Sequence, residues 1–180
     1  LKHLNCHQSN YIVQFLQKIA YREQYKIGNQ KRSIDNTIMY RYKVNVVKVV
    51  DGDTVDVDID LGFGMTYKKQ RVRMVGIDTP ESRTRDLVEK KFGKASKAHL
   101  KSILESGDIE LVSHDKGKFG RILGDLFIGS STFSVNQQMI NDHHAVAYTG
   151  GNKEETEKGH MANREILIAN GTVVLDESES

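Results

Sequence analysis

Apolar and polar residues alternate most clearly between Val55 and Leu61, where valine, isoleucine and leucine take every second position and aspartates take the others. This period of two predicts a strand with one enclosed face and a solvated face that carries the aspartates. Asp53 shares the parity of the valines, so we expect its carboxylate to lean toward the enclosed side. Similar short segments predict further strands at residues 42–50, 71–77, 109–112 and 121–128.

Helical spacing replaces this alternation after Pro80, the only proline of the chain. Apolar residues then recur at intervals of three and four up to Leu104, and we expect Gly107 to stop this helix. Ser134 is a suitable N-cap for a short second helix, and a third is expected within residues 152–169. About five short strands with interspersed helices favour an α+β fold with a mainly β core, in which helices pack outside a small barrel.

Residues 1–38 differ in composition from the rest of the chain. They are rich in Gln, Asn and Lys and hold six Lys or Arg against two Asp or Glu, which leaves twenty and twenty-two for the remainder. We interpret them as a poorly ordered N-terminal extension or arm, residues 39–175 as one domain, and residues 176–180 as an acidic tail. Because the first methionine is Met39, we expect the native start there and expect the arm to be dispensable for folding and catalysis. A genuine N-terminal arm is the competing interpretation.

The composition excludes several classes of protein. The formal charge is +2, and since the arm is basic, any affinity of the domain for phosphate must come from local positive charge. Cys6 is the only cysteine, so no intramolecular disulfide can form. No apolar run reaches the roughly eighteen to twenty residues that span a bilayer, and no signal peptide is evident. We therefore expect a cytoplasmic monomer without membrane contact, with secretion open if the true N-terminus differs.

Three short segments carry residues suited to phosphodiester cleavage: Asp-Gly-Asp-Thr-Val at 51–55, Arg73 followed by Asp-Thr-Pro-Glu at 78–81, and Lys-Phe-Gly-Arg at 118–121. Cleavage requires that the anionic charge of the phosphate be neutralised and that a water be activated. The first two segments supply acidic oxygens for a cation and a spare carboxylate. The last two supply arginines for the phosphate.

Each of these residue types has a chemical reason to take part. Asp53, Asp78 and the carbonyl of Thr79 are hard oxygen ligands, which favour calcium or magnesium over zinc. Glu81 lies nearby and is not needed as a ligand, so it is the natural general base. Arg73 and Arg121, if they face the same site, each offer a forked pair of donors to phosphoryl oxygens.

In this order and spacing the segments resemble the staphylococcal nuclease (thermonuclease-like) family, from about Tyr40 to Tyr148 and more loosely through the last helix. The resemblance implies an OB-type five-stranded β-barrel with about three packed helices. It also implies calcium-dependent hydrolysis of DNA and RNA that leaves 3'-phosphate ends. Carried over to this chain, it makes Asp53, Asp78 and Thr79 the Ca²⁺ ligands, Glu81 the residue that activates water, Arg73 and Arg121 the phosphoryl-binding residues, and Asp51 a residue just behind the ligands.

The same resemblance assigns substrate contacts to Lys118, Phe119 and Tyr148. Phe119 stands where the family often has tyrosine, so a hydroxyl contact to a terminal phosphate is missing, and Gly150 stands where a second tyrosine is expected. Base stacking is therefore weaker or supplied elsewhere. The alternative function is a catalytically silent OB-type module that binds single-stranded nucleic acid. A calcium-dependent interaction domain is a third possibility. Binding alone does not need both Glu81 and the metal aspartates, which favours the nuclease.

Overall fold

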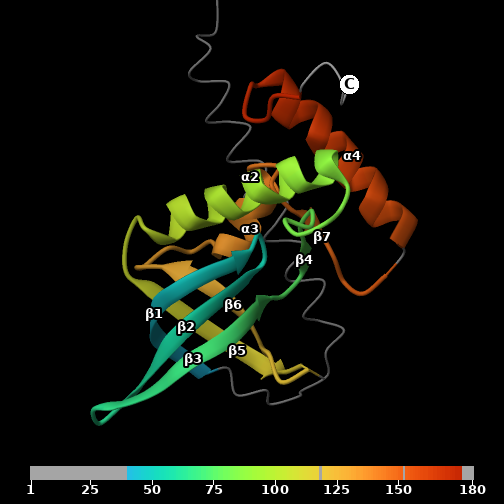
Figure 1. The fold of residues 1–180 in the computed structure, drawn as a ribbon. Coiled ribbons are helices and arrows are strands. Elements are labelled where there is room, and N and C mark those ends of the chain that lie inside the picture. The colour runs from blue at the N-terminus through green and yellow to red at the C-terminus, as the bar shows by residue number, and fades with distance from the viewer. Residues whose placement is uncertain (1–39, 118, 152, 176–180) are drawn as a thin grey trace, which may run out of the picture. The chain divides into compact units, whose positions relative to one another are not determined.

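The computed structural model describes residues 40–117, 119–151 and 153–175. The predicted arm, the predicted acidic tail and Lys118 lie outside the described residues. The elements, drawn in Figure 1, are β1 (Tyr40–Asp51), β2 (Thr54–Gly62), β3 (Met65–Met74), β4 (Ile77–Asp78), α2 (Leu87–Leu104), β5 (Ile109–Lys116), β6 (Ile122–Ile128), α3 (Val135–Asn141), β7 (Val146–Ala147) and α4 (Lys153–Ala169).

Five strands close into a barrel in the order β1-β2-β3-β6-β5. All neighbours run antiparallel except β3 and β6, which run parallel and pair Val72 with Ile122 and Arg73 with Leu123. With the three helices of the described residues, this is the OB-type α+β fold that the sequence predicted. The parallel pairing places Arg121, which immediately precedes β6, beside the strand that carries Arg73.

The alternating segment of β2 supplies one wall of the hydrophobic core. Val55, Val57 and Ile59 are buried there, whereas Leu61 is exposed although it follows the same alternation. The pairing of β2 with β3 shifts register twice before the hairpin tip, which interrupts the alternation near its end. Figure 1 shows α2 lying across one end of the barrel, where its Leu100 joins the same core.

Several boundaries differ from the sequence prediction, among them the end of β5, which continues to Lys116 rather than stopping at Val112. Helix α2 ends at Leu104 rather than near Gly107, because the N–H of Ser106 donates to the carbonyl of Ile103, three residues back, and so departs from the four-residue spacing of the helix. The third predicted strand starts earlier than expected and stops at Met74. Gly76 then takes a positive φ of 73°, which turns the chain so that β4 forms separately.

The two remaining helices, α3 and α4, are held by a capping residue and by apolar packing. Ser134 caps α3, as predicted, by accepting a hydrogen bond from the N–H of Gln137. Helix α4 packs on α2 through Leu167, which lies in a small apolar cluster with Phe92 and Val173. Within the described part of the chain, no helix combines the length and the apolar character needed to cross a membrane.

Candidate active site

A polar pocket of about 340 Å³ lies where the β1–β2 turn, β3, the segment after β4 and the residue before β6 meet. The structure brings together here all of the residues predicted as metal ligands or catalytic groups, together with the predicted supporting aspartate. They are Asp51, Asp53, Arg73, Asp78, Thr79, Glu81 and Arg121. The pocket therefore gathers residues from segments up to seventy positions apart.

The guanidinium of Arg73 lies between two carboxylates in this pocket. One of its terminal nitrogens pairs with Asp53, and the other lies 3.3 Å from Oδ1 of Asp78. Burial lowers the pKa of Arg73, the charge of Asp78 opposes this shift, and the charge of Arg121 adds to it. An arginine stays protonated under these conditions. Since one cationic group contacts both aspartates, the two carboxylates converge on a single point.

The barrel itself positions Asp53. This residue lies between β1 and β2, and its carbonyl accepts a hydrogen bond of 2.9 Å from the N–H of Met74 in β3. The neighbouring Thr54 hydroxyl donates to Oδ1 at 2.8 Å. Asp53 is 8% exposed, in keeping with the enclosed side that its parity predicted. The bond to β3 thus fixes the backbone of Asp53, and the bond from Thr54 of β2 orients its carboxylate.

Asp78 is positioned by the far end of the chain. It pairs with Val146 across the short β4–β7 sheet. Its Oδ2 lies 3.0 Å from Nε2 of His160, a largely buried residue of α4. The sequence analysis missed His160, because a histidine within an amphipathic helix carries no signal of a partner 82 residues away. The structure thus ties α4 to one of the two converging carboxylates.

Two glycines allow the loop that carries Glu81 to lie directly on neighbouring backbone. A Cβ on Gly93 of α2 would fall 2.5 Å from the carbonyl carbon and oxygen of Glu81 and from the nitrogen of Ser82. A Cβ on Gly52 would fall 2.8 Å from the hydroxyl of Thr79. Side chains at either position would therefore displace the loop, and the close packing depends on their absence.

Hydrogen bonds hold the same loop from two sides. The N–H of Glu81 donates to Glu89 of α2, and the N–H of Ser82 donates to Asp51, both at 3.3 Å. The side chain of Glu81 is left exposed toward the pocket. Burial raises the pKa of Glu81, the carboxylates of Asp51, Glu89 and Asp78 raise it further, and Arg73 opposes them. A raised pKa makes its carboxylate a stronger base.

The predicted substrate contacts are only partly gathered here. Phe119 is 85% exposed in a hollow that shares Arg71 and Arg121 with the pocket, and the Arg121 guanidinium lies 5.8 Å from its ring centre. Lys118 lies outside the described residues. Tyr148 lines a separate hollow between β7 and α4, so its contact with substrate stays a prediction. Arg83, which sequence reasoning missed, lines the pocket two residues after the predicted base.

The structure is thus an OB-type barrel protein with a polar pocket that combines carboxylates with arginines. The family model described as Staphylococcal nuclease homologue matches residues 71–167, more than half of the chain. The chain belongs to this family.

Individual relatives cover the same part of the sequence. The chain is 31% identical over 103 residues to the Thermonuclease of Staphylococcus hyicus, covering 56% of this chain and 56% of that protein. It is 30% identical over 115 residues to Endonuclease YhcR of Bacillus subtilis (strain 168), covering 59% of this chain and 9% of that protein. An Uncharacterized endonuclease of Escherichia coli is 31% identical over 103 residues, 57% and 59% of the two chains. The match thus spans little more than half of the thermonuclease.

Proposed function

We propose that this protein is a calcium-dependent nuclease that hydrolyses phosphodiester bonds of DNA and RNA and leaves 3'-phosphate ends. The observation that carries the proposal is the convergence of Asp53 and Asp78 on one cationic position, with Glu81 and two arginines around the same pocket. Relatives whose names describe nucleases and endonucleases support it.

The donor set of this pocket fits a hard divalent cation. Asp53, Asp78 and the carbonyl of Thr79 would hold Ca²⁺, which would neutralise charge on the scissile phosphate. No group of three or more His, Cys, Asp or Glu side chains able to hold a metal is found among the described residues. Water and the substrate phosphate must therefore complete the coordination, and we expect weak calcium binding without substrate.

The arginines, Glu81 and Asp51 would then each have a separate role in the reaction. With Ca²⁺ held between the aspartates, the guanidinium of Arg73 would be free to donate to phosphoryl oxygens. Arg121, which precedes the strand paired with β3 and lines the same pocket, would donate to the same phosphoryl group. Glu81 takes a proton from the attacking water. Asp51, through its bond to Ser82, holds the loop that presents Glu81.

The decisive experiment compares plasmid DNA and RNA incubated with the protein in calcium and in excess chelator. We expect cleavage in calcium that is lost on chelation, with 3'-phosphate found at the new ends. Glu81→Gln should slow turnover by roughly two to four orders of magnitude, the usual scale for removing a general base, while binding persists. Glu157→Gln, on an exposed face of α4, is the matched control and should retain activity.

Three results would contradict the proposal in different ways. Binding without any cleavage in calcium would identify the silent nucleic-acid-binding module. Undiminished cleavage in excess chelator would remove calcium from the mechanism. Unchanged turnover of Glu81→Gln would remove that residue as the base.

A further inference from the structure

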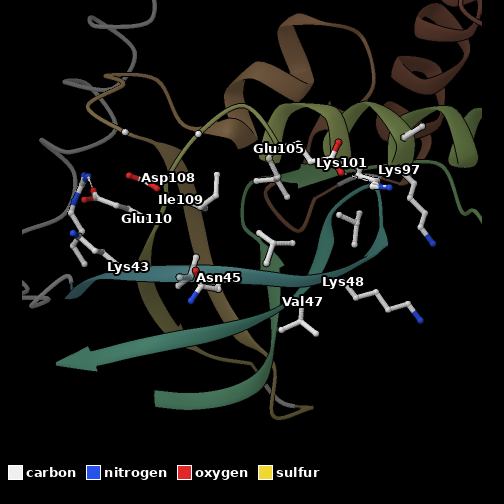
Figure 2. Close-up of a pocket in the computed structure, with 18 of the residues that line it drawn as sticks. Lys43, Asn45, Val47, Lys48, Lys97, Lys101, Glu105, Asp108, Ile109 and Glu110 are labelled. Atoms are coloured by element: carbon white, nitrogen blue, oxygen red, sulfur yellow. Dashed lines mark hydrogen bonds and ion pairs between the residues drawn. The ribbon is translucent and has the colours of Figure 1, made fainter. Parts of the chain in front are cut away.

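A second and larger hollow, the β1–α2 groove, lies between strand β1 and helix α2 (Figure 2). Its volume is about 1470 Å³, and it extends to the start of β5. Apolar side chains lie along it, including the buried Val44, Val49, Leu104 and Ile109, while charged side chains line its rim. None of the predicted catalytic residues lines this groove.

The positive charges of the groove are only partly neutralised. Arg41 pairs with Glu110 at 2.6 Å, and Lys101 pairs with Glu105 at 3.6 Å. Four other lysines that line the groove make no ion pair with any described residue. They are Lys43 and Lys48 of β1 and Lys94 and Lys97 of α2.

Lys43 lies opposite Glu110 in the β1–β5 register, whereas Lys48 and Lys97 lie at the other end of the groove. In Figure 2, Lys48 and Lys97 extend from facing elements toward the same end, away from Glu110 and Asp108. Lys48 lies opposite Asp56 in the β1–β2 register, and the pKa of Asp56 is lowered first by the hydrogen bond from Arg71 and also by the charge of Lys48. Both oxygens of that carboxylate are already bound by Arg71 at 2.7 and 2.9 Å, so Lys48 makes no direct ion pair with it. The positive charge at this end is therefore available to an external anion.

This basic end adjoins the candidate active site along both walls. On β1, Lys48 and Val49 line the groove, and the next two residues, Val50 and Asp51, line the active-site pocket. A strand rises about 3.3 Å per residue, so Lys48 lies roughly 10 Å along β1 from Asp51. On α2, Lys94 lines the groove directly after Gly93, which touches the Glu81 backbone.

We infer that the β1–α2 groove binds the phosphate backbone of a single-stranded nucleic acid whose scissile bond lies in the active-site pocket. The inference rests on the proposed function for the direction of the strand. Unpaired lysines suit phosphates, and the apolar floor suits the sugars and bases that a single strand exposes but a duplex covers. No aromatic side chain is among the described lining residues, so this groove adds affinity without reading sequence.

The test measures binding of the full chain to a labelled 20-nucleotide single strand and to a trinucleotide, in chelator so that nothing is cut. Lys48→Gln/Lys97→Gln should weaken binding of the 20-mer roughly tenfold at about 50 mM salt and make the plot of log affinity against log salt shallower by about 1.4. Affinity for the trinucleotide should change little. Lys68→Gln/Lys158→Gln, which removes two exposed lysines outside the groove, is the matched control.

Three outcomes would overturn the inference. The first is that the groove variant binds the 20-mer as tightly as the control variant does. The second is that a 20-base-pair duplex binds the unmodified protein more tightly than the single strand does, and that its affinity falls as much in the groove variant. The third is that a polyglutamate peptide binds as tightly as the 20-mer and that its affinity falls equally in the groove variant. That result would identify the groove as a surface for acidic protein segments. Failure of the protein to cleave DNA or RNA would remove the proposed function and leave this binding difference intact.

Discussion

Gly93→Ala is a single-methyl change that should separate catalysis from stability. The added Cβ would lie 2.5 Å from backbone atoms of Glu81 and Ser82, whereas ordinary contacts begin near 3.4 Å. The loop must therefore retreat by about 1 Å, and a misplacement of that size costs about a hundredfold in rate. Helix propensity favours alanine by about 1 kcal/mol, and overpacking costs typically 1–3 kcal/mol. Net destabilisation should thus be at most about 2 kcal/mol.

The assay pairs turnover on single-stranded DNA in calcium with urea unfolding of the same samples. We expect a loss of about a hundredfold in turnover with cooperative unfolding retained. Gly151→Ala adds a methyl group with no atom closer than 4.0 Å and serves as the control. Turnover of Gly93→Ala within threefold of the control would refute the argument that close packing on α2 positions Glu81. Loss of cooperative unfolding would show that the glycine serves folding instead.

Four further predictions use other contacts. Arg121→Lys keeps the charge but loses the two-donor geometry, so turnover should fall by about a thousandfold, or roughly 4 kcal/mol; near-normal turnover would show that charge suffices. His160→Leu removes the hydrogen bond to Asp78, a proposed calcium ligand. Calorimetry with uncleaved substrate should therefore show roughly tenfold weaker calcium binding, and unchanged calcium affinity would count against a role of His160 in orienting that ligand. Because burial and then the neighbouring carboxylates raise the pKa of Glu81, activity should rise with pH through that raised value. Glu89→Gln removes one of these charges and should move the acidic limb of the pH profile to lower pH; a move to higher pH would contradict this. Burial lowers the pKa of His144 to about 4 from 6.5, so the unfolded chain binds a proton at this residue more readily than the folded protein does. The free energy of unfolding should therefore fall as the pH drops from 6.5 toward 4. His144→Phe should flatten this pH dependence in a series of urea-unfolding curves, and an unchanged slope would refute the prediction.

Features that depend on neighbouring residues could be predicted from the sequence. Alternation located β2 and the enclosed side of Asp53, and Ser134 marked the start of α3, since strand parity and helix capping act within a few residues. The three motifs also indicated which side chains meet in the pocket. Their chemistry follows from residue type, so hard oxygens, a spare carboxylate and two arginines could be recognised before any fold was known.

Contacts between distant segments became visible only in the folded structure. His160 reaches Asp78, Gly93 contacts Glu81, and Lys48 faces the same groove as Lys97. None of these pairs has a local pattern, because each depends on how helices pack across the barrel rather than on the period of either segment. The end of α2 at Leu104 also differs from the sequence prediction, since the hydrogen bond from Ser106 to Ile103 ends the helical pattern before the glycine that marked its end in the sequence.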